Sequence, residues 1–203
     1  MRRVLLLAFV FQASFALVAS KGSTAPGTYK DWNDIDEVEI LQTFKFADFG
    51  SVIVTPMDKS AVTLPPEGEN TYAVTKQIYF ASDGLLLEGL RGAIRGFRKG
   101  VTVESKAEPT APAGGPKVLV MRAKLLTLDP GSQAARYFGG FGAGSGVAKI
   151  SVELVDSSTG TVLARFTHEK RSGSGAFGGS YEKVMSKSIK EVGEDFGKGL
   201  KAF

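Results

Sequence analysis

Residues 136–181 read, in order, RYFGGFGAGSG, VAKISVELV, DSSTG, TVLARFTHEKR and SGSGAFGGSY. The second and fourth pieces alternate apolar and polar residues, which predicts two β-strands with one buried face each. The five residues between them predict a tight hairpin turn. Asp156 can hydrogen-bond its own backbone there, and Gly160 can supply the positive φ that the turn needs. A glycine-dense segment flanks each outer end, so the stretch predicts a fold but no chemistry.

The rest of the pattern extends this hairpin into a layered domain. Strands are predicted near 44–54, 101–104 and 117–128, and helices over 72–97, with a break near Ser82–Gly84, and from Tyr181 to Leu200. Gly89, Gly92 and Gly96 are poor helix formers, and their spacing predicts either close approach to a sheet or a helix with a thin packing face.

One face of the predicted sheet is polar, so the two helices are expected to cover the other face. The predicted fold class is therefore α/β (α+β). It is a two-layer sandwich whose mixed, mostly antiparallel sheet is covered on one face by two helices, in the order β-α-β-β-β-β-α.

The first twenty residues are typical of a secretory signal peptide. Arg2 and Arg3 precede an apolar run, and small residues end it near Ala19 and Ser20. A retained membrane anchor is the alternative, although the apolar run is short for a span. An acidic, turn-rich stretch follows. We therefore predict a signal peptide over 1–20, a flexible leader over 21–40 and a single domain over 41–203, located in the periplasm or secreted.

Charge and cysteine content limit the classes of function. The formal net charge is +4, and loss of Arg2 and Arg3 with the leader would reduce it to +2. This whole-chain value is too small to argue for nucleic acid or an anionic membrane as partner. The chain has no cysteine, so disulfides are excluded and a packed core must provide the stability.

Several motifs together resemble a bacterial envelope family known only as domain of unknown function 4410, many of whose members look like lipoproteins. They are R-x-x-G-G-F-G-A-G-S-G, V-D-x-x-T-G-x-V-L-A-R-F, S-G-x-G-x-x-G-G-x-Y and the closing D-F-G-K-G-L-K-A-F. The layout also resembles the TolB amino-terminal and CsgG-type α/β domains. No cysteine follows the apolar run, so this chain lacks the lipid-attachment site of the lipoproteins. The resemblance implies an envelope location and no particular activity.

Cofactor binding and catalysis are not favoured. Gly173, Gly175 and Gly178 match a dinucleotide fingerprint, but they follow an antiparallel strand and no second parallel strand remains to carry the ribose-binding acid. His168 is the only histidine, and no G-x-S-x-G surrounds a serine. We interpret His168 as a surface or sheet-edge residue, and we predict no enzymatic activity, no cofactor and no metal site.

A binding or assembly module remains. Arg136, Tyr137, Phe138 and Phe141 lie among glycines, where no regular element obliges them to face the core, and exposed aromatics there can contact a protein partner. We predict an envelope protein as this partner, with no nucleic acid and no membrane span after signal removal. Two alternatives stay open. The aromatics can cover the end of the sandwich, or the glycine-rich loops can bind a small ligand or phosphate or serve a hydrolase.

Overall fold

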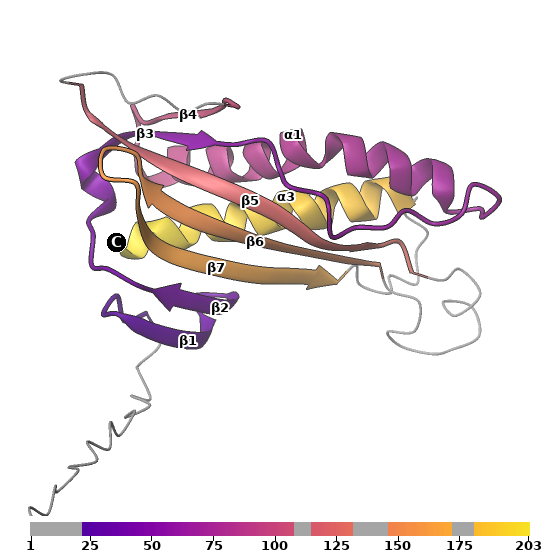
Figure 1. The fold of residues 1–203 in the computed structure, drawn as a ribbon, viewed down its shortest axis with the longest axis horizontal. Coiled ribbons are helices and arrows are strands. Elements are labelled where there is room, and N and C mark those ends of the chain that lie inside the picture. The colour runs from indigo at the N-terminus through magenta and orange to yellow at the C-terminus, as the bar shows by residue number, and fades with distance from the viewer. Residues whose placement is uncertain (1–21, 108–114, 132–145, 172–180) are drawn as a thin grey trace, which may run out of the picture.

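The computed structural model describes residues 22–107, 115–131, 146–171 and 181–203. These residues form a seven-stranded sheet and two long helices (Figure 1). The elements are β1 (Gly27–Trp32), β2 (Ile35–Ile40), η1 (Phe46–Asp48), β3 (Phe49–Val54), α1 (Tyr72–Phe97), β4 (Thr102–Ser105), β5 (Lys117–Asp129), β6 (Val147–Asp156), β7 (Thr161–Arg171), α3 (Tyr181–Gly199) and η2 (Leu200–Ala202).

The strand order in the sheet is β1-β2-β7-β6-β5-β3-β4. β3 pairs in parallel with β4 and with β5, and the other neighbours are antiparallel. α1 and α3 lie side by side along the sheet (Figure 1). The molecule is a two-layer sandwich with a mixed, mostly antiparallel sheet, and from β3 to α3 its order is β-α-β-β-β-β-α. The predicted fold class is confirmed.

The turn between β6 and β7 has the chemistry that its sequence indicated. The Asp156 carboxylate accepts a hydrogen bond of 2.9 Å from the Ser158 backbone N–H. The Gly160 N–H donates to the Asp156 carbonyl at 2.8 Å, and Gly160 has a φ of +71°. A side chain would be strained at this φ, so the glycine fixes the turn and with it the register of the hairpin.

The prediction of a flexible leader over residues 21–40 is wrong, because β1 and β2 extend the sheet beyond β7. Trp32, Ile35 and Val38 are almost completely buried in the core. The acidic residues between them point outward, as in the ion pair of Glu39 with Arg165. The stretch is therefore a half-buried strand pattern whose polar half is acidic, and the folded domain begins before residue 41.

The two helices pack closely through glycines. A Cβ on Gly89 of α1 would overlap the Lys190 backbone carbonyl of α3, and one on Gly193 would overlap the Leu86 carbonyl of α1. The predicted close approach exists, but the partner of Gly89 is a helix and not the sheet. α1 also continues without the predicted break through Ser82–Gly84, where Asp83 accepts a 2.6 Å hydrogen bond from the Met57 N–H.

The opposite face of the sheet is largely polar, as expected. Arg165 of β7 forms ion pairs with Glu39 of β2 at 2.8 Å and with Glu153 of β6 at 2.9 Å. A small apolar cluster at one end of this face is the exception, formed by Ile53, Val118, Val120, Val155 and Val162. The main core lies between the sheet and the helices, and its largest members include Trp32, Phe166 and Phe196.

Candidate functional site

Three strands meet in register at one end of the sheet. Asp129 at the end of β5 pairs with Val147 at the start of β6, and Val147 pairs with Arg171 at the end of β7. The chain therefore leaves β5 and returns to β6 at the same end of the sheet from which it leaves β7. We call this place the loop end.

Both helices begin at the loop end. α3 starts on this side of the molecule (Figure 1), and Gln77 of α1 donates a 2.8 Å hydrogen bond to Glu182 in the first turn of α3. One turn beyond Gln77, the Phe80 side chain is 67% exposed, and its ring stands edge-on to that of Tyr79. The loop end therefore includes an exposed aromatic residue that the sequence analysis did not single out.

The four predicted partner-binding residues, Arg136, Tyr137, Phe138 and Phe141, lie outside the described residues. The same is true of Gly173, Gly175 and Gly178, and of the predicted signal peptide. Their positions in the chain nevertheless connect them to described strands. The segment with the aromatics joins β5 to β6 and the second glycine-rich segment joins β7 to α3, so both attach at the loop end.

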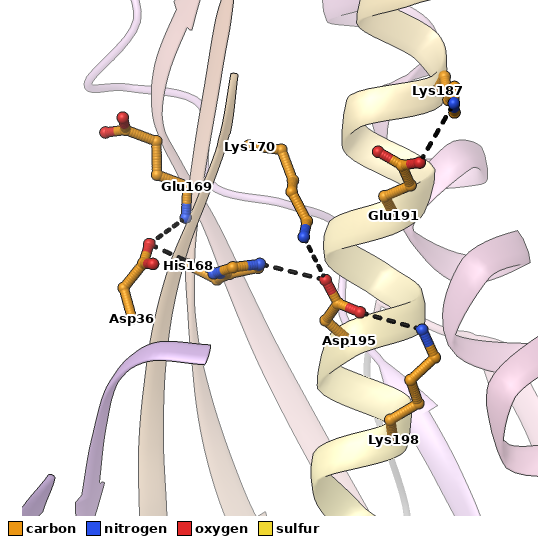
Figure 2. Close-up of polar contacts among 8 residues, drawn as sticks. All are labelled: Asp36, His168, Glu169, Lys170, Lys187, Glu191, Asp195 and Lys198. Atoms are coloured by element: carbon orange, nitrogen blue, oxygen red, sulfur yellow. Dashed lines mark hydrogen bonds and ion pairs between the residues drawn. The ribbon is translucent and has the colours of Figure 1, made fainter. Parts of the chain in front are cut away.

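A buried polar cluster lies between the sheet and α3, well inside the sandwich (Figure 2). His168 of β7 is 3% exposed, and its Nε2 lies 3.2 Å from Oδ2 of Asp195 on α3. Its Nδ1 lies 3.2 Å from Oδ2 of Asp36 on β2, without the alignment of a hydrogen bond. The imidazole thus lies between two carboxylates, and each of these contacts becomes an ion pair when the ring is protonated.

Asp36 continues the pairing of β2 with β7 by means of its side chain. The residue pairs of this ladder end at Glu37 and Thr167. Beyond them the Glu169 N–H donates a 2.7 Å hydrogen bond to the Asp36 carboxylate instead of a backbone carbonyl. Asp36 therefore joins the edge hairpin to β7 at the position of His168.

Asp195 gathers the other charges of the cluster. Lys170 lies 2.7 Å and Lys198 3.1 Å from its carboxylate (Figure 2). Burial alone would raise the pKa of Asp195. The hydrogen bonds from His168, Lys170 and Lys198 outweigh it, so the pKa lies well below its usual value. Asp195 is therefore a permanent anion near neutral pH, held by three basic side chains.

The interpretation of His168 as a surface or sheet-edge residue is wrong, since β7 lies inside the sheet and the ring is buried. A signal for this was present in the sequence. Ala164 and Phe166 mark the buried face of the strand, and His168 continues their alternation. The acidic partners could not be read in the same way, because Asp36 and Asp195 come from distant parts of the chain.

The cluster fits a structural role better than a chemical one. A general base needs a reacting group within hydrogen-bond reach, and the groups that contact the imidazole nitrogens here are carboxylates. In the described part of the chain, no three His, Cys, Asp or Glu residues are placed to hold a metal ion. The arrangement joins β2, β7 and α3 through buried charge, and it can make their packing depend on pH.

Comparison with known proteins confirms the family resemblance. Residues 87–178 match the model of the family described as Domain of unknown function (DUF4410). No curated protein matches the sequence.

Two solved structures share the general layout. The PelC dodecamer from Paraburkholderia phytofirmans is 16% identical with a TM-score of 0.47, and the match covers 78% of this chain and 96% of the PelC chain. Protein XCC0632 from Xanthomonas campestris, of the family DUF330, is 10% identical with a TM-score of 0.42, covering 74% and 82%. The function of this chain does not follow from either similarity.

Within the described residues, no helix combines the length and the apolar content needed to cross a membrane.

Proposed function

We propose that the protein is an exported component of the bacterial cell envelope, periplasmic or secreted, which acts as a binding or assembly module and has no catalytic activity. The observation that carries the proposal is the register of the loop end, where Asp129, Val147 and Arg171 lie side by side. This register attaches both glycine-rich segments at one place, beside the exposed Phe80.

The residue types at the loop end suit a protein partner. Aromatic and arginine side chains contribute most of the binding energy in protein interfaces, and Arg136, Tyr137, Phe138 and Phe141 are of these types. Glycines next to them allow a partner backbone to come close. We therefore assign these four residues, together with Phe80, to the contact with an envelope protein.

Capture from envelope extracts tests the assignment. Immobilised protein should retain a partner, and the double variant Tyr137→Ser/Phe141→Ser should lose it while its thermal unfolding stays unchanged. Phe80→Ser should weaken capture as well. Leu41→Ser is the matched control, since Leu41 is also exposed but lies on the segment between β2 and η1. Unchanged capture by the double variant would mean that the aromatics serve the fold and that the assigned residues are wrong.

Export is tested separately. Amino-terminal sequencing of the protein from the envelope fraction should find a first residue near Lys21, because the leader has the basic, apolar and small-residue regions of a signal peptide. An intact Met1 on a cytoplasmic protein would contradict the proposed location.

A further inference from the structure

Basic side chains gather at the end of the molecule opposite the loop end, where α1 and α3 finish. They come from the start of η1, the last turns of α1 and η2, and we call this set the basic end: Lys45, Arg91, Arg95, Arg98, Lys99 and Lys201. Printed contacts join these elements. The Phe46 N–H donates a 3.0 Å hydrogen bond to the Phe203 carbonyl, and the Phe46 and Phe97 rings lie 5.9 Å apart.

Two arginines of the basic end are fixed without losing their charge. Arg91 donates to the Val103 carbonyl at 2.9 and 3.1 Å. Arg98 donates to the carbonyls of Phe46 and Ala47 and lies over the Phe46 ring. Their acceptors are neutral backbone groups, and within the described residues none of the six basic side chains has a carboxylate partner. Their positive charge is therefore held in place and left uncompensated.

The basic end accounts for the positive charge of the whole chain. Within residues 45–48, 91–100 and 200–203, six basic side chains and one acidic side chain, Asp48, give a formal charge of +5. The complete sequence carries +4, so all other residues together carry −1. Favourable interaction with the helix C-terminus explains basic residues in the last turn of α1. It does not explain Lys45 or Lys201, which belong to other elements.

The amino-terminal segment joins the fold on the same side. The Trp32 indole N–H donates a 2.8 Å hydrogen bond to the Ser23 carbonyl, and the Trp32 ring lies 5.5 Å from that of Phe203. The apolar leader that precedes Ser23 must meet a membrane during export. Leu41, one of two large apolar side chains that are exposed among the described residues, lies a few residues before Lys45.

From this placement we propose that the basic end is a docking surface for the anionic phospholipid headgroups of a membrane. Each Lys or Arg near such a surface adds attraction, and several together give measurable binding. Docking through this end would direct the loop end away from the membrane and toward a partner. Whole-chain charge had argued against an anionic membrane, and the concentration of this charge at one end reverses that argument.

Vesicle co-flotation tests the proposal. The envelope-purified protein should bind vesicles of phosphatidylcholine mixed with phosphatidylglycerol, should not bind phosphatidylcholine alone, and should release as salt screens the charges. The variant Arg95→Gln/Lys99→Gln/Lys201→Gln should bind at least about tenfold more weakly. These three side chains make no printed hydrogen bond, so the fold should survive, and circular dichroism checks it.

The matched control removes three positive charges elsewhere. Arg122→Gln/Lys149→Gln/Lys187→Gln changes the sheet face and α3 but should bind the anionic vesicles like the parent chain. Equal loss in both triple variants would show that net charge acts and not the basic end, and this would overturn the proposal. So would binding to a soluble acidic polysaccharide without any binding to phosphatidylglycerol vesicles, because the partner would then be a glycan.

Discussion

Asp195 shows how a single residue can govern the packing of distant elements. Its carboxylate holds His168 of β7 and two lysines, and burial makes each of these contacts stronger than it would be at the surface. Removing one member of such a cluster leaves the others buried and unpaired. For this reason His168→Ala cannot test catalysis cleanly, because lost activity and lost folding would coincide.

At the residue scale we predict that Asp195→Asn lowers the free energy of unfolding by about 3 kcal/mol near neutral pH. The folded pKa of Asp195 lies below its usual value of 3.8, so its stabilising contribution is present above about pH 4 and is lost as the pH falls further. Urea unfolding from neutral to acidic pH should show the parent and the variant converging below that value.

Asp58 provides the control for this prediction. Hydrogen bonds from Ser60 lower its pKa to about 2, but its side chain is exposed beside Lys124. Solvent screens such a contact, so Asp58→Asn should change stability far less than Asp195→Asn. A constant difference between parent and Asp195→Asn over the whole pH range would contradict the role assigned to the carboxylate.

At the element scale, the contact between α1 and α3 depends on glycines that touch the backbone of the other helix. α1 carries further glycines in the same i, i+4 rhythm on its exposed side, and these meet no other atoms. A Cβ on Gly92 would have nothing within 4 Å. The same substitution on one helix should therefore have opposite effects at buried and exposed positions.

We predict that Gly89→Ala lowers the free energy of unfolding by about 3 kcal/mol, because its methyl group would overlap the Lys190 carbonyl and force the helices apart. Gly92→Ala should instead raise it by about 1 kcal/mol through helix propensity. Chemical denaturation of both variants measures the two effects. Similar values for the pair would mean that helix contact does not set the requirement for glycine.

At the scale of the whole molecule, the sandwich has two unlike ends and one extra hairpin. The loop end carries the attachment of both glycine-rich segments, and the other end carries the excess positive charge. β1 and β2 lie at the edge of the sheet next to β7, and they contribute Trp32 and Ile35 to the main core. The hairpin is therefore part of the domain and not a leader to it.

Limited proteolysis should reflect this boundary. We predict that the resistant fragment begins before Gly27, because cleavage within β1 or β2 would require Trp32 and Val38 to leave the core. Mass spectrometry of the fragment identifies its first residue. A resistant fragment that begins near residue 41 would instead support a flexible leader and would contradict the packing of the hairpin.

The sequence by itself determined the elements from β3 to α3 and their order. Periodicity and turn chemistry are local properties, and the Asp156–Gly160 turn and the stripe of α3 express them within a few residues. The acidic hairpin was misread because its charged half concealed an alternating strand.

Only the tertiary structure decided which distant residues meet. Asp36 and Asp195 lie far apart in the chain, and strand register and helix packing bring both of them to His168. The same packing collects the basic side chains of η1, α1 and η2 at one end. A whole-chain charge of +4 gives no indication of that concentration, because it carries no information on where the charges lie.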